Sequence, residues 1–292
     1  MPLFFAIASS LSSTDSYLNM ILSFPGISAN AVLVLFLLTL FRVIPIISLA
    51  PFLGARNLPA ATKMRFGIAL SAIFIPYVLI HANKNIDFSM IFIVYAVKEI
   101  LLGFALGFLI SIPFYIGMTS GGLVDHVRGA SSLQITDPST QSQTGPIGIL
   151  YNYALIAIFF LLGGPLYFFQ VLSYSFALLP VDGYFHPAFF QENVSFWKSI
   201  TAILYRVMSL AIQLAAPSLI GILMIEMFLG IANRLAPQVQ IVFLGIPLKS
   251  WVGIFFLAIS WIFVMDSLGK ESLDWVKMLQ EMLKKMQPFQ RT

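Results

Sequence analysis

The sequence predicts an all-α, membrane-associated protein, and three observations lead to this fold class. The 292 residues include only 16 Lys and Arg and 12 Asp and Glu, so 10% of the chain is charged, against roughly a quarter in soluble domains. Hydrophobic residues make up 59% of the chain, and the mean hydropathy is +0.92. Several stretches without charge are long enough for a membrane-spanning helix of about 20 residues. These observations exclude a soluble enzyme.

The residue types also limit the chemistry. Cys is absent, which excludes disulfides, thiolate catalysis and Cys-ligated metals. The three His residues lie far apart in the sequence, and no nucleotide, phosphate or metal motif is present. The net charge of +4 comes without a basic stripe interleaved with aromatic residues. We therefore expect no catalysis, no cofactor, no bound metal and no bound nucleic acid. We interpret the excess of basic residues as charge that sets the orientation of the helices in the membrane.

Charged residues divide the first half of the chain into apolar segments. The stretches between these charges predict a first helix over about 30–50, with Arg42 inside it, and a second over about 66–80. Between them, residues 54–65 carry three basic residues and no acid, so the positive-inside rule places this loop in the cytoplasm. A third segment over about 88–115 is either one tilted helix or two pieces broken near Pro113.

A long polar connection separates the two halves. Residues 119–146 are rich in Ser, Thr, Gly and Gln, and we assign them to a loop, which is either a solvated linker or a mobile gating element. Residues 138–181 carry no charge, and Gly163-Gly164-Pro165 within them predicts two helices joined by a tight turn. Counting 147–181 once or twice gives six or seven hydrophobic segments.

The last segments predict apolar helices over about 207–231 and 251–265. From Asp266 the apolar residues recur at spacings of three and four among charged residues, as in an amphipathic helix. We therefore divide the chain into a hydrophobic core, 1–265, and a C-terminal amphipathic helix, 266–292. If 147–181 crosses twice, this tail and the basic loop share the cytoplasmic side; if it crosses once, they lie on opposite sides.

Four charged residues lie inside apolar segments, where an ionised side chain costs at least about 2.5 kcal/mol. They are Arg42, Lys98, Glu99 and Glu226. Such charges form either an ion or proton relay or polar contacts between helices or subunits. Small residues also recur at four-residue spacing, Gly103 with Gly107 and Gly117 with Gly121, which lets helices approach closely.

The sequence resembles the FliR/SctT family, the export-apparatus proteins of bacterial flagella and type III secretion systems, over nearly its whole length. The matching residues, in order, are Phe41-Arg42, Pro45, Pro51, Gly54, Pro59, Glu99, Gly103, Gly107, Gly121-Gly122, Asp125, Gly129, Asp137-Pro138, Gly163-Gly164, Glu226, Gly230, Asn233-Arg234, Pro237-Gln238, Phe243, Pro247, Lys249 and Ser250. The last third looks more like the virulence SctT branch. The sequence departs from the flagellar pattern in a Ser/Gln-rich extension, 139–146, and an aromatic insert, 182–198.

The resemblance implies a structural subunit of an export gate. It implies bent helical hairpins that assemble with SctR/FliP-type and SctS/FliQ-type membrane subunits into the inner-membrane entrance channel for unfolded proteins. Part of the core would be raised out of the membrane toward the periplasm, with the rest in contact with lipid. The C-terminal tail would meet the SctU/FlhB-type protein in the cytoplasm. The rival interpretation is a secondary transporter of a small solute.

The resemblance also implies two sets of site residues. The polar connection would plug the closed pore, with the expected plug and gating residues Gly121, Gly122, Asp125, Gly129, Asp137 and Pro138. The expected subunit-packing and polar-contact residues are Arg42, Glu99, Gly103, Gly107, Glu226, Gly230, Asn233, Arg234, Pro237, Gln238 and Lys249. Within the second set, we expect Glu226 and Arg234 to form an inter-subunit polar contact.

Overall fold

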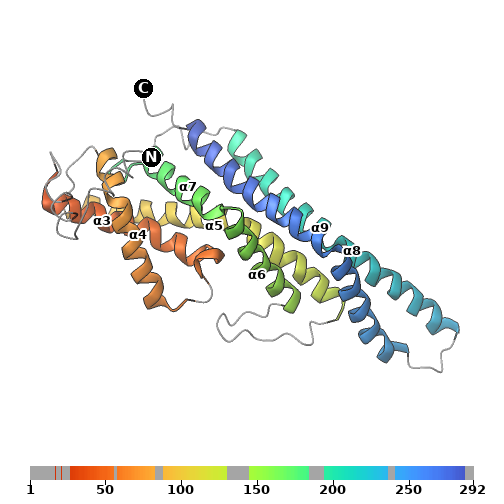
Figure 1. Cartoon of the computed structure of the whole chain (residues 1–292). Coiled ribbons are helices and arrows are strands. Elements are labelled where there is room, and N and C mark those ends of the chain that lie inside the picture. Colours follow the sequence, from red (N-terminus) through yellow and green to blue (C-terminus); the bar gives the residue numbers. More distant parts are fainter. Residues whose placement is uncertain are drawn as a thin grey trace. The chain divides into compact units, whose positions relative to one another are not determined.

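The computed structural model describes residues 17, 21, 27–55, 58–82, 88–129, 145–183, 194–235 and 241–286. Most of these residues are helical, and no strand lies among them, which confirms the predicted all-α class (Figure 1). The elements are α3 (Ala29–Leu49), the 3-10 helix η1 (Pro51–Leu53), α4 (Ala60–His81), α5 (Met90–Val127), α6 (Pro146–Leu161), α7 (Gly164–Leu178), α8 (Val194–Leu235) and α9 (Ile241–Met286).

Five of these helices, α3, α4, α5, α8 and α9, are long and apolar enough to cross a membrane. The bent pair α6 and α7 adds a sixth candidate if it counts as one span. The turn between α6 and α7 lies at Leu162 and Gly163, and Gly163 has a φ of 73°, a conformation that favours glycine. The prediction of two helices joined by a tight turn is therefore confirmed.

The helices form two compact units. The first unit contains α3, α4, α5 up to Ile110, α7 from Leu166 and the last residues of α9. Its core is apolar and aromatic. Phe52 meets Phe168 edge to face with ring centroids 5.2 Å apart, and Phe74 lies 5.9 Å from Phe176. Since α3 also packs along α4, this core brings the first two hydrophobic segments together with α7.

The second unit contains α5 from Ser111, α6, α8 and α9 up to Trp275. Its core includes an edge-to-face pair of Phe114 and Phe159, with ring centroids 5.4 Å apart. Helices α8 and α9 run side by side as a hairpin, as Figure 1 shows in cyan and blue. Gly221 is the close-approach point, because a Cβ there would lie 2.5 Å from the Phe256 ring.

One sequence-based boundary was wrong, because α5 is longer than expected. Helix α5 continues through Pro113 and through 119–127, which we had assigned to the polar loop. Ser120 and Asp125 of this stretch are buried, and Asp125 accepts from the backbone N–H of Ile147 in α6. The C-terminal segment is helical, as expected, and it continues α9 without a break at Asp266.

The glycines spaced at four residues let α5 lie close to α3. A Cβ on Gly103 would lie 3.1 Å from the carbonyl carbon of Arg42 and closer still to its oxygen. A Cβ on Gly107 would lie 3.0 Å from the Cα of Ile46. The expected close helix approach therefore occurs within the chain.

We predict that Gly103→Ala destabilises the protein by about 1–3 kcal/mol, the usual cost of overpacking, because the α3 backbone cannot yield as a side chain would. The matched control is Gly230→Ala, since nothing lies within 4 Å of a Cβ at that position. Alanine there should instead stabilise α8 by about 0.5–1 kcal/mol. Thermal unfolding of the detergent-extracted protein measures both, and equal shifts for the two variants would contradict the close approach.

Candidate functional site

A buried ion cluster, formed by Arg42, Lys98 and Glu99, joins α3 to α5 inside the first unit. The Arg42 guanidinium makes a two-pronged contact with Glu99, with Nε on Oε2 and with Nη2 2.8 Å from Oε1. The Lys98 ammonium lies 2.8 Å from the same Oε1. Arg42 and Glu99 are fully buried, and Lys98 is nearly so. A carboxylate thus compensates two cations that would otherwise be costly to bury.

The end of α7 supplies the remaining partners of the cluster. The last carbonyls of a helix have no partner within it and carry partial negative charge, which favours nearby cations. Arg42 donates to the carbonyl oxygens of Ser175 and Leu179, at 2.9 and 2.7 Å. Lys98 donates to three carbonyl oxygens in the chain just beyond α7, those of Pro180, Val181 and Gly183. The cluster therefore fixes the end of α7 against α3 and α5.

A stacking contact completes the surroundings of Arg42. Its guanidinium carbon lies 4.4 Å from the centre of the Phe176 ring, so the cation is bound by a ring face as well as by oxygen atoms. The sequence left a relay and a structural contact open for these charges. The structure brings Arg42, Lys98 and Glu99 into one internal contact, in which both carboxylate oxygens of Glu99 are engaged.

A second polar group, which we call the Asp125 network, lies in the second unit. It consists of Asp125 and Arg128 near the end of α5, the first backbone N–H groups of α6, and Ser250 of α9. Asp125 and Arg128 are buried. Arg128 was missed by sequence reasoning, although its position three residues after Asp125 is the spacing of a helical ion pair.

The expected gating glycines have three different environments. Gly121 lies in α5 against the backbone of Gly148, so a Cβ there would lie 2.6 Å from the Gly148 Cα. Gly122 is also in α5 and has open space beside it. Gly129 follows α5 with a φ of 85°. The expectation that Gly121 and Gly122 lie in a flexible loop was therefore wrong, because this stretch is helical; Asp137 and Pro138 lie outside the described residues.

The third polar group is a partly exposed ion pair on the α8–α9 hairpin. Lys249 donates to Glu226 at 2.5 Å, and their side chains are 25% and 39% exposed. Asn233, Arg234 and Gly230 are exposed farther along α8. Glu226 pairs with Lys249 within the chain, and the expected inter-subunit contact of Glu226 and Arg234 stays a prediction. Pro237 and Gln238 lie outside the described residues.

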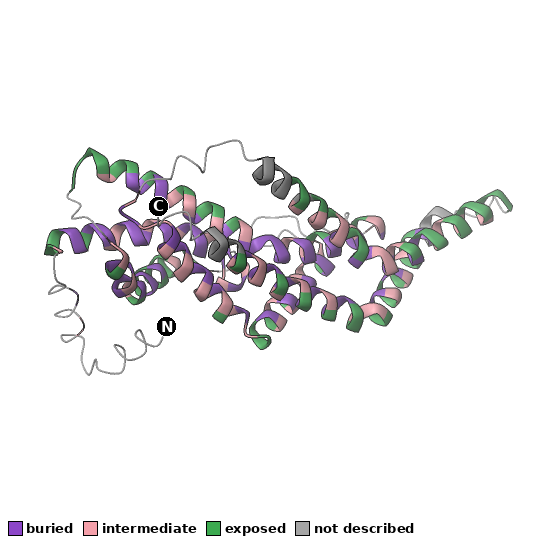
Figure 2. Ribbon diagram, turned by 90° about the horizontal axis from the view of Figure 1, so that it is seen from above, coloured by how far each residue is buried: buried purple, intermediate pink, exposed green. Residues whose placement is uncertain are grey.

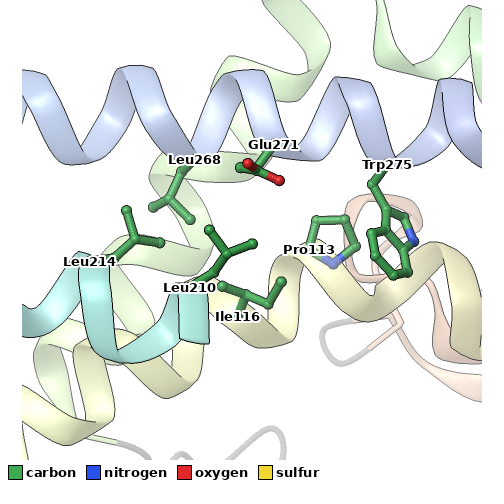
Figure 3. Close-up of a pocket in the computed structure, with 7 residues that line it drawn as sticks. All are labelled: Pro113, Ile116, Leu210, Leu214, Leu268, Glu271 and Trp275. Carbon is green, nitrogen blue, oxygen red and sulfur yellow. The ribbon is translucent and has the colours of Figure 1, made fainter. Parts of the chain in front are cut away.

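A small cavity lies in the second unit. It has a volume of about 10 Å³, which is room for about one water molecule. Figure 3 shows its apolar walls and the Glu271 carboxylate, which pairs with Arg206 at 2.8 Å. Its lining residues are Pro113, Ile116, Leu210, Leu214, Leu268, Glu271 and Trp275. Among the described residues, no group of three potential ligands could hold a metal ion.

We predict that Glu99→Ala lowers the free energy of unfolding by about 3–5 kcal/mol, because it leaves two buried cations without their carboxylate. Replacing both partners, as Arg42→Met/Glu99→Leu, should cost less than the two single changes together. The matched control is Asp266→Ala, which breaks the exposed pair with Lys270 and should cost at most about 1 kcal/mol. Denaturant titration in detergent measures all of these; a Glu99→Ala protein as stable as the control would contradict a structural role.

Comparison with known proteins agrees with the resemblance seen in the sequence. Residues 33–274 match the model of the bacterial export proteins, family 1. The chain is 30% identical over 249 residues to the Yop proteins translocation protein T of Yersinia pestis, covering 84% of this chain and 91% of that one. It is 29% identical to the secretion system apparatus protein SsaT of Salmonella typhimurium, covering 77% and 85%. It is also 29% identical to the flagellar biosynthetic protein FliR of Escherichia coli, covering 75% and 81%.

These relatives come from both type III secretion and flagellar export, and they align over most of their own length as well as most of this chain. The family match includes the buried ion cluster, the Asp125 network and the Glu226–Lys249 pair. The chain therefore belongs to family 1 of the bacterial export proteins, the FliR/SctT family of export-apparatus membrane proteins.

Proposed function

We propose that this chain is a structural, non-enzymatic subunit of a type III export gate. With SctR/FliP-type and SctS/FliQ-type membrane subunits it forms the inner-membrane entrance channel for unfolded proteins. The family match over 33–274 supports this proposal, as do relatives named for Yop protein translocation, a secretion apparatus and flagellar biosynthesis.

The surface of the α8–α9 hairpin is the observation that carries the proposal. Large apolar side chains are exposed along both helices, among them Met227, Phe228 and Trp251. The partly exposed Glu226–Lys249 pair lies among them. Hydrocarbon would disfavour the ion pair, and water would disfavour the apolar side chains, whereas a protein partner can satisfy both. The exposed residues of these helices are green in Figure 2.

The buried charges support a static subunit over a transporter. A coupling site needs ionisable groups that face a substrate or a water-filled path. Here Arg42 and Glu99 are fully buried and engaged with each other and with backbone carbonyls.

We further propose that the polar connection after α5 plugs the closed pore, as the family resemblance implies. Gly129 supports this, because its positive φ lets the chain leave α5 in a direction that other residues rarely allow. Gly121 then serves helix packing. The segment from 266 onward is proposed to face the cytoplasm and to contact the SctU/FlhB-type protein, with part of the hydrophobic core raised toward the periplasm.

Native mass spectrometry tests the proposed function directly. The detergent-extracted chain, expressed with SctR-type and SctS-type subunits from the same source, should give one discrete complex that contains all three. Expressed alone it should be unstable or heterogeneous, because its exposed apolar surface lacks a partner. A stable, uncomplexed chain under both conditions would contradict the proposal and favour the transporter.

A charge-reversal pair tests whether the hairpin is the partner surface. Glu226→Lys places two like charges side by side, so recovery of the partner subunits should fall about fivefold or more. Glu226→Lys/Lys249→Glu restores the internal pair with reversed polarity. If recovery of the partner subunits stays low in the double variant, their binding depends on the sign of the charges at this surface. If recovery returns to the original level, the ion pair acts only within the chain. Full recovery with Glu226→Lys would exclude both roles.

A further inference from the structure

The first turns of α4 carry basic side chains without a carboxylate to balance them. Arg65 is exposed, and Lys63 is half-buried and donates to the carbonyl oxygen of Ala55. Among the residues that the structure describes, neither of these cations forms an ion pair. Residues 16–86 contain no Asp or Glu, and Arg56, outside the described residues, adds a third basic residue to the sequence. Within the described structure, the positive charge at the start of α4 is therefore not neutralised.

Apolar side chains continue the outer face of α4 beyond these cations. Side chains three or four positions apart lie on one side of a helix, so Ile68 follows Arg65 on this face, and Ile73 lies beyond it. Ile68, Ile73 and Ile80 are all exposed. With a rise of about 1.5 Å per residue, the face extends about 18 Å from Ile68 to Ile80. Since α4 is also long and apolar enough to cross a membrane, the cations lie at one end of a face suited to hydrocarbon.

This order of side chains matches the boundary between hydrocarbon and water. Lys and Arg near the end of a membrane helix lay their stems along apolar surface and direct the charged group to the headgroups. Anionic headgroups attract basic residues at this level of the bilayer. A free anion would satisfy the charge and leave the isoleucine face uncovered. An anionic phospholipid satisfies both, because one molecule supplies a phosphate and acyl chains.

From this arrangement we propose that Lys63 and Arg65 bind the headgroup of an anionic phospholipid, whose acyl chains lie along the Ile68–Ile80 face. Arg65 is the main contact, because its guanidinium is exposed and can donate to a phosphate through two parallel N–H groups. Lys63 contributes less, because its ammonium already donates to the Ala55 carbonyl. The bound lipid keeps the start of α4 at the level of the headgroups, whether or not the chain is assembled with other subunits.

A single fluorescent label tests the site, because the chain contains no Cys. Ala61 is exposed in the first turn of α4, so Ala61→Cys can carry the label in the full chain, reconstituted in phosphatidylcholine vesicles. Spin-labelled phosphatidylglycerol should quench the label at about fivefold lower concentration than spin-labelled phosphatidylcholine, the factor expected for one favourable contact of a cation with anionic lipid. Equal quenching by the two lipids would overturn the proposal.

Charge removal tests which residues cause the preference for phosphatidylglycerol. In the labelled chain, Arg65→Gln should bring quenching by the two lipids close to equality, and Lys63→Gln should reduce the preference by a smaller factor. The matched control is Lys270→Gln, which removes an exposed cation that pairs with Asp266 and should leave the preference unchanged. A preference that survives Arg65→Gln together with Lys63→Gln would contradict the assignment to this site.

Salt dependence gives a second test that needs no change at the two cations. The screening length falls from about 10 Å at 0.1 M salt to about 3 Å at 1 M, so the preference for phosphatidylglycerol should fall with added NaCl. Inorganic phosphate at equal ionic strength should lower it no further, because it has no acyl chains; a larger fall would indicate a site for the free anion and overturn the lipid assignment. If the lipid preference is absent and Arg65→Gln lowers recovery of a co-expressed subunit, the surface binds an acidic protein segment and the proposal fails.

Discussion

The contact between Arg42 and Glu99 is the constraint on which the first unit depends. Two cations and a carboxylate are buried where water cannot reach them, so each must find fixed partners. They find them in one another and in the carbonyl groups at the end of α7. Three segments that are far apart in the sequence are thereby held at one point, and Gly103 allows α5 to come close enough for the contact to form.

The second unit applies the same principle at the start of a helix. There the exposed groups are N–H donors, so the partner is an acid, Asp125, with Arg128 behind it. In both units, helix ends in apolar surroundings are completed by side chains from other helices. Unsatisfied backbone groups would otherwise cost several kcal/mol each in such surroundings. The polar residues of this hydrophobic chain therefore mark where its helices must meet.

The outer faces of α8 and α9 differ from these buried contacts. Their apolar side chains and the Glu226–Lys249 pair are both exposed within this chain. Such a mixed surface suits neither lipid nor water alone. It fits a protein that completes its packing in an assembly, as the export-apparatus relatives of this chain suggest.

The sequence by itself determined the helical class, the apolar segments, the turn at Gly163 and the family, because these follow from composition, charge spacing and local motifs. It also indicated that Arg42, Glu99 and Asp125 matter. Only the tertiary structure decided their partners. The cap on α6 comes from a residue far along the chain, and the polar stretch 119–127 is helical because α6 covers its buried side. Local patterns cannot show this, since partners far apart in sequence supply the contacts that override local preference.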